Sequence, residues 1–168
     1  MRYFPAALAL SLVLAVTGSI GQAKVSDPID PRANELLSSG RSALAHGDVT
    51  MATDEFESAL VVDPGYTGTL VALGDAARKA GLQGKAIHYY RVALERDPND
   101  LAAIGGEGGA MAEKGALEKA RANLAKLEGL CGKGCAESRM LADAIAKGPA
   151  PKIVSAEAVK PQPVVEAN

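Results

Sequence analysis

The chain has 168 residues, of which 48% are hydrophobic, 23% charged and only 4% aromatic. This length suits a single small globular or repeat domain, and the many alanines and glycines favour closely packed helices over a β-sandwich. A formal net charge of −2 provides neither the basic field that attracts nucleic acid nor the acidic field that holds many cations.

The first 23 residues have the features of a secretory signal peptide. Arg2 supplies a positive start, residues 6–16 form a short apolar run, and Gly21 and Ala23 place small residues at the −3 and −1 positions of a cleavage site. Cleavage after Ala23 predicts an exported, periplasmic protein with no stable membrane span. Retention of this segment as an N-terminal anchor is the alternative.

An extended lead-in is expected at 24–32, because Pro28 and Pro31 interrupt it and its apolar residues show little periodicity. Over 33–147, apolar residues recur at three- and four-residue steps, which predicts amphipathic helices. Glycines that can adopt the left-handed conformation, and prolines that disfavour helix in the preceding residue, separate these helices. These helix-ending positions are Gly47, Asp63-Pro64, Gly81, Asp97-Pro98 and Gly115.

The same features recur every 34 residues, as Gly40, Gly74 and Gly108 illustrate. A period of this length is typical of stacked helical hairpins. The copies cover about 33–66, 67–100 and 101–134, and a further amphipathic helix at about 135–147 would cap the last copy, as stacked arrays require.

Residues 148–168 contain four prolines and few bulky apolar side chains. Such a composition cannot build its own core, so we expect a flexible tail. The apolar pairs Ile153-Val154 and Val164-Val165 leave weak docking elsewhere as the alternative.

The repeat resembles the tetratricopeptide repeat, a helix-turn-helix unit of 34 residues with small and hydrophobic residues at fixed positions. The first copy departs from that pattern at Ser39, and the third copy departs at Glu107, Leu127 and Gly132. The resemblance implies an all-α, right-handed α-solenoid of three tetratricopeptide hairpins plus a C-terminal capping helix. The second copy matches almost completely, at Leu70, Leu73, Gly74, Ala77, Ala86, Tyr90, Ala93 and Pro98.

In that family the first helix of each repeat lines a concave groove that holds a protein or peptide. The resemblance therefore implies a periplasmic scaffold or adaptor, in envelope assembly, secretion or pilus biogenesis, rather than an enzyme. The Lys, Asn and Arg set with which chaperone-binding members clamp a peptide carboxylate is absent. Solvated positions that bind nothing, and self-association through the repeat ends, are alternatives. The mapped groove residues are Asn34, Leu37, Arg41, Leu44, Val71, Asp75, Arg78, Lys79, Gly105, Gly109 and Glu113.

Four glycines occupy five positions from Gly105 to Gly109, inside an expected helix. Each costs about 1 kcal/mol of helix stability relative to alanine. The run lacks the residues of a phosphate loop or a dinucleotide fingerprint. It indicates either tight packing of the third hairpin on the second or a bare patch of the groove that a partner side chain enters.

Cys131 and Cys135 are the only cysteines, and a close pair in an exported protein predicts a disulfide. This disulfide would replace the missing proline at the end of the third copy. A thiol-redox accessory factor that uses the same pair is the alternative function. A metal site would need further ligands, and His46 and His88 are distant in sequence. No catalytic constellation is present, and no cofactor is expected.

Overall fold

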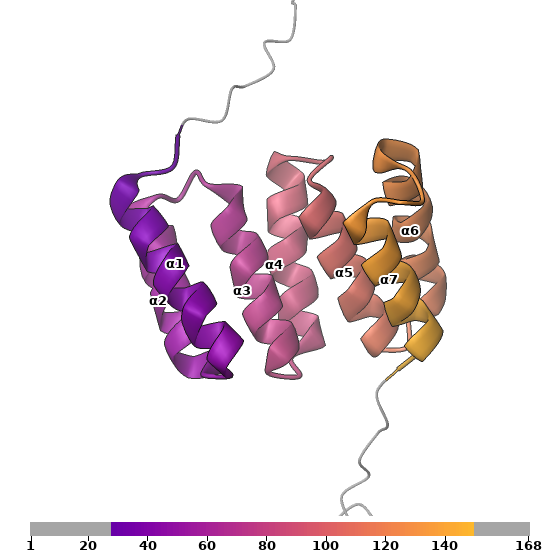
Figure 1. Ribbon diagram of the computed structural model, residues 1–168, viewed down its shortest axis with the longest axis horizontal. Coiled ribbons are helices and arrows are strands. Elements are labelled where there is room, and N and C mark those ends of the chain that lie inside the picture. Colours follow the sequence, from indigo (N-terminus) through magenta and orange to yellow (C-terminus); the bar gives the residue numbers. More distant parts are fainter. Residues whose placement is uncertain (1–27, 150–168) are drawn as a thin grey trace, which may run out of the picture.

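The computed structural model describes residues 28–149, and these residues form seven α-helices and no strand. Consecutive helices pair into three hairpins that follow one another along the long axis of the molecule, and the seventh helix lies beside the last hairpin (Figure 1). This arrangement confirms an all-α solenoid of three hairpins with an added C-terminal helix. The helices are α1 (Pro31–His46), α2 (Val49–Val62), α3 (Thr67–Lys79), α4 (Gln83–Arg96), α5 (Leu101–Glu113), α6 (Leu117–Cys131) and α7 (Ala136–Lys147).

The first helices of the hairpins form one continuous layer. Helix α1 contacts α3, α3 contacts α5, and α5 contacts α7, whereas among the described residues α2 does not approach α4 and α4 does not approach α6. Because the helices approach more closely in the first layer than in the second, the stack curves with α1, α3, α5 and α7 on its concave side. The expected signal peptide, and residues 150–168 of the expected tail, lie outside the described residues.

The first helix begins two residues earlier than the sequence pattern indicated. The Asp30 carboxylate accepts hydrogen bonds from the backbone N–H groups of Arg32 (2.8 Å) and Ala33 (3.4 Å), which caps the helix. Pro31 fits the first helical turn, where its missing N–H costs nothing. The extended lead-in therefore ends at Asp30 and not at residue 32, because proline starts a helix as readily as it stops one.

A glycine facing a buried aromatic ring recurs in the first two hairpins. Gly40 faces Phe56, and Gly74 faces Tyr90, and both rings are fully buried. A Cβ atom at Gly74 would lie 2.5 Å from Tyr90 Cε1, which is closer than real Cβ contacts come. The small and aromatic positions of the repeat are thus two halves of one contact, because the ring fills the space that the absent side chain leaves.

In the third copy the corresponding glycine, Gly108, faces Leu141 of α7, and the preceding residue, Glu107, forms a polar cluster. Glu107 is buried, and its carboxylate accepts hydrogen bonds from Arg91 Nε (2.8 Å) on α4 and Asn123 Nδ2 (3.0 Å) on α6. Asn123 Nδ2 also lies 3.2 Å from the carbonyl oxygen of Ile104. A buried carboxylate is tolerated when it is paired and hydrogen-bonded in this way. The departure of Glu107 from the repeat pattern therefore ties three helices together.

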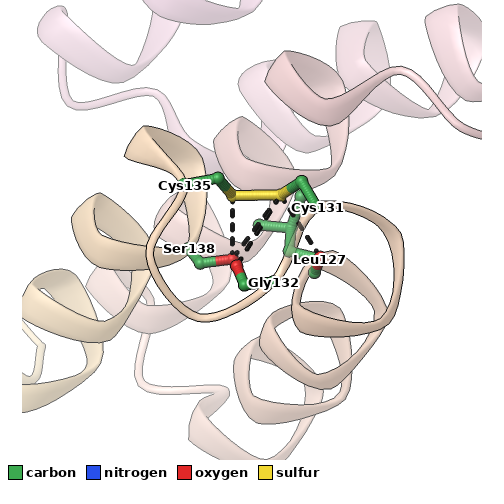
Figure 2. The surroundings of a disulfide bond; sticks show 5 residues. All are labelled: Leu127, Cys131, Gly132, Cys135 and Ser138. Carbon is green, nitrogen blue, oxygen red and sulfur yellow. Dashed lines mark hydrogen bonds between the residues drawn. A yellow bond between two sulfur atoms is a disulfide. The ribbon is translucent and has the colours of Figure 1, made fainter.

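Helix α7 is attached to the last hairpin by a disulfide (Figure 2). Cys131 is the last residue of α6, Cys135 is the residue before α7, and the two sulfurs are bonded across a Cα–Cα distance of 5.9 Å. The buried Ser138 hydroxyl lies 3.1 Å from Cys135 Sγ. The pairing expected from the sequence is present, and it closes the short loop between α6 and α7.

None of the helices described between residues 28 and 149 is long and apolar enough to cross a bilayer.

Candidate functional site

Three helices of the concave layer enclose a hollow of about 350 Å³, here named the α3–α5–α7 hollow. Most of its surface is apolar, with two carboxylates and one guanidinium among the groups that line it. A mainly apolar concavity with a few polar groups is the usual form of a binding site. The lining residues are Val71, Asp75 and Arg78 of α3, Ala102, Gly105, Gly106 and Gly109 of α5, and Glu137, Met140, Leu141 and Ala144 of α7.

A second hollow, of about 440 Å³, continues the first toward the end of α7. Arg78, Met140 and Ala144 line both hollows, so the two form one groove. The second hollow adds Glu113 of α5 and three residues at the end of α7 and just beyond it. These three residues are Lys147, Gly148 and Pro149.

The glycines of α5 determine how closely α7 approaches. A Cβ atom at Gly108 would lie 2.7 Å from Leu141 Cδ2, so only glycine lets α7 seat its buried leucine there. A Cβ atom at Gly105 would lie 3.6 Å from Glu137 Cβ, which is an ordinary contact. Helix α7 therefore forms a wall of the hollow as well as a cap on the third hairpin.

The sequence left two interpretations of the glycine run open, tight packing and a bare patch of the groove. Different glycines of the run fit each of them. Gly106 faces the buried Tyr90 ring and Gly108 faces Leu141, so both serve tight packing. Gly105 and Gly109 line the hollow, although the Arg78 guanidinium covers Gly109 at 2.7 Å from where its Cβ atom would stand. Bare backbone open to a partner is therefore confined to the neighbourhood of Gly105, which is half-buried.

A hydrogen-bonded set of charged groups lies along one side of the hollow. Tyr90 Oη donates to Asp75 Oδ1 at 2.6 Å, and Arg78 donates from Nη2 to Glu113 Oε1 at 2.5 Å. Arg78 thus pairs with Glu113 across α3 and α5, whereas Asp75 has a phenol as its partner. Arg78 is therefore already neutralised by Glu113. Among the groups that line the first hollow, the carboxylates of Asp75 and Glu137 then leave a net negative charge.

Asp75 is held in an environment that opposes its charge. Although Asp75 as a whole reaches solvent, its carboxyl end lies against the buried Tyr90 side chain. Burial raises the pKa of Asp75 above its usual 3.8 and outweighs the Tyr90 hydrogen bond and the charges of Arg78 and Arg41, which lower it. Burial also raises the pKa of Tyr90, so its phenol stays protonated and remains a donor. A cationic group that entered the hollow would stabilise the charged form of the Asp75 carboxylate.

The eleven groove residues expected from the sequence divide into three groups. Six line the groove: Val71, Asp75, Arg78, Gly105 and Gly109 in the first hollow, and Glu113 in the second. Asn34, Arg41 and Lys79 are exposed outside it, and Leu44 is half-buried, with its carbonyl oxygen accepting a hydrogen bond from Lys79 Nζ at 2.8 Å.

Leu37 was wrongly expected on the groove surface. Its side chain is fully buried in the core of the first hairpin, in the cluster that contains Phe56. The family position alone placed it in the groove. The physical reason is that burying the apolar Leu37 side chain against the Phe56 ring stabilises the folded state more than exposing it to solvent would.

Helix α7 contributes a wall of the site that the repeat pattern did not indicate. Glu137, Met140, Ala144 and Lys147 all face the groove, yet α7 was expected only as a cap. Their spacing of three and four residues places them on one helical face, which was the available signal. Because α7 follows a complete hairpin, it also occupies the layer in which another first helix would lie.

The described residues hold no evident catalytic or metal centre. Cys131, Cys135 and Glu137 bring three potential ligand atoms within 4.8 Å of one another. Both sulfurs belong to the disulfide, however, so neither provides the thiolate that a metal ion would need. The arrangement is suited to binding a chain segment by apolar contact and charge.

No protein-family model matches this sequence, and no curated protein matches it either. Solved structures do resemble the fold. The Sgt2 TPR domain from Aspergillus fumigatus is 24% identical, with a TM-score of 0.62 over 83% of this chain and 90% of that one. The Yersinia enterocolitica type III secretion chaperone SycD, in complex with a peptide of the translocator YopD, is 21% identical, with a TM-score of 0.58 over 68% of this chain and 92% of that one.

The first TPR domain of Spaghetti (RPAP3), bound to the HSP90 peptide SRMEEVD, is 18% identical. It matches with a TM-score of 0.60 over 68% of this chain and 94% of that one. Each of these domains is covered almost completely, and the described helices follow the same succession of hairpins. The chain therefore has the fold of the tetratricopeptide-repeat domains.

Proposed function

We propose that the protein is an adaptor that holds an extended segment of a partner protein in the α3–α5–α7 hollow. The observation that carries this proposal is the open, mainly apolar groove in which Met140 remains 64% exposed. A methionine at such a surface adapts to differently shaped apolar side chains. Two solved neighbours were captured with peptides, the HSP90 peptide on RPAP3 and the YopD peptide on SycD, which supports the same use here.

The charges of the hollow define the chemistry of the segment. Val71, Met140 and Ala144 offer apolar contact, and Asp75 and Glu137 offer carboxylates. Since Arg78 is already paired with Glu113, an incoming acidic group finds no free cation among the groups that line the first hollow. The proposed ligand is an extended segment that combines an apolar pair with a lysine or arginine.

We propose that the adaptor acts in the periplasm, in envelope assembly, secretion or pilus biogenesis. The features that support export are the apolar, small-residue start of the sequence and the disulfide, which persists in oxidising compartments. The pathway itself is proposed by analogy with the secretion chaperone among the structural neighbours.

A single substitution at Met140 tests the proposal. Peptides are first selected from a displayed library of random twelve-residue sequences on the chain that starts at Lys24, and the affinity of the best binder is measured by calorimetry. Met140→Asp replaces apolar contact with a solvated charge that would face the apolar pair of the ligand, so we expect about a tenfold or larger loss of affinity, close to 1.4 kcal/mol.

Met51→Asp is the matched control, because Met51 is also exposed, at 48%, but lies on α2 in the other layer. It should leave the affinity unchanged. Equal losses in the two variants, or none in either, would place peptide binding elsewhere and overturn the proposal.

A further inference from the structure

We propose that residues 150–168 of the same chain occupy the α3–α5–α7 hollow until a partner displaces them. This inference rests on the proposed function and proposes how binding is regulated. The C-terminal segment of the adaptor would compete with the partner for the same hollow. It commits to one occupant, a segment whose attachment point lies in the groove and whose chemistry matches the lining.

The chain leaves α7 along the groove. Gly148 has a positive φ of 71°, and its N–H lies 3.2 Å from the carbonyl oxygens of both Ala144 and Ile145, which fixes the direction after the helix. Pro149, the last described residue, lines the second hollow together with Arg78 and Glu113, and its Cβ would lie 3.7 Å from a Cβ atom at Gly115. The described chain therefore ends at the groove, with Pro149 in its lining.

The chain beyond Pro149 is long enough to extend into the hollow. An extended chain covers about 3.3 Å per residue, so Lys152 reaches roughly 10 Å beyond Pro149, about the distance between two packed helices. Tethering at one end also gives an effective concentration in the millimolar range for a short flexible link, so contacts too weak to hold a free peptide suffice here.

The composition of the segment complements the hollow. Lys152 precedes the apolar pair Ile153-Val154, which is the combination of cation and apolar contact that the lining favours. Asp75 and Glu137 offer carboxylates to the lysine, and apolar groups of α3 and α7 offer contact to the pair. Pro149 and Pro151, which precede this stretch, favour an extended conformation, the form that a groove binds at low entropic cost.

Carbodiimide crosslinking tests the placement directly on the chain that starts at Lys24. The reagent joins a lysine amine to a carboxylate only when the two are in contact. We expect an amide between Lys152 and Asp75 or Glu137 in monomeric protein, with a yield that does not change between low and high protein concentration. A crosslink found only in dimers would assign the hollow to a second copy, and no crosslink to these carboxylates would leave it empty; either result overturns the inference.

Oxidation of Met140 by hydrogen peroxide gives an independent measurement, because the rate follows exposure. Ile153→Asp with Val154→Asp should release the segment and speed oxidation of Met140 several-fold. Met51, on α2, should keep its rate and serves as the internal control. Ala156→Asp with Ala158→Asp adds the same charge without removing the apolar pair, so it should leave Met140 protected. Equal Met140 rates in all three proteins would contradict the proposal.

Peptide affinity separates this inference from the proposed function. If the segment competes, the selected library peptide should bind the Ile153→Asp, Val154→Asp variant several-fold more tightly than the parent. If that affinity is unchanged while Met140→Asp still weakens binding, the hollow binds partners but not its own chain, and only the inference fails.

Discussion

Gly106→Ala is expected to lower the free energy of unfolding by about 2 kcal/mol, although alanine is the better helix former. Gly106 faces the fully buried Tyr90 ring from α5, and Gly74 faces the same ring from α3. A Cβ atom on either glycine would overlap the ring. Because the ring is enclosed between two helices, it cannot move away without separating the second hairpin from the third.

Gly105→Ala, one position earlier on the same helix, is the matched control. Its Cβ atom would make only ordinary contacts, so it should be neutral or stabilise the fold by up to about 1 kcal/mol through helix propensity. Gly84→Ala on α4, where nothing lies within 4 Å, should do the same. Urea denaturation of the three variants measures the difference. If Gly106→Ala proved as stable as Gly105→Ala, the packing account of the glycine run would be wrong.

Loss of the disulfide is expected to lower the free energy of unfolding by about 2 kcal/mol, the loop-closure value for a short ring. Cys131 and Cys135 join α6 to α7, and the loop between them contains two glycines, so without the bond α7 is held mainly by Leu141 and its neighbours. Thermal unfolding with and without a dithiol reductant measures the effect. The purified native protein should show no free thiol before reduction.

The variant with Cys131→Ser and Cys135→Ser supplies the control, because it should unfold at the temperature of the reduced protein and not respond to reductant. It should also bind the selected peptide more weakly, since α7 carries one wall of the hollow. Two titratable thiols in the native protein, or an unchanged melting temperature after reduction, would contradict this. Insulin reduction that depends on Cys131 would instead favour the thiol-redox alternative.

The hairpins were predictable from the sequence because their determinants are local and repeat. Gly47, Gly81 and Gly115 all adopt positive φ between helices, as their spacing indicated. The Gly74 and Tyr90 contact also follows from the repeat, since a small residue and a ring at fixed offsets meet within one hairpin. Start positions were less certain: Pro31 marks the first turn of α1, where the pattern indicated the end of a lead-in.

The site was only partly predictable, because it depends on contacts that the repeat pattern does not contain. Leu37 occupies a family groove position but joins the core beside Phe56. Helix α7 lies outside the three copies, and its approach to α5 depends on the contact between Gly108 and Leu141. The repeat does not predict this contact, because Leu141 belongs to none of the copies. Buried polar pairs such as Glu107 with Arg91 likewise appear only when three helices are in place.

Chemical-shift mapping tests the central claim, that the α3–α5–α7 hollow is the partner-binding surface. Backbone amide signals of the isotope-labelled chain from Lys24 onward are recorded during titration with the selected peptide. The account predicts the largest shifts at Val71, Gly105 and Ala144, with the signals of α2 unchanged. Shifts concentrated on α2, α4 and α6 would contradict it, because those helices form the opposite layer.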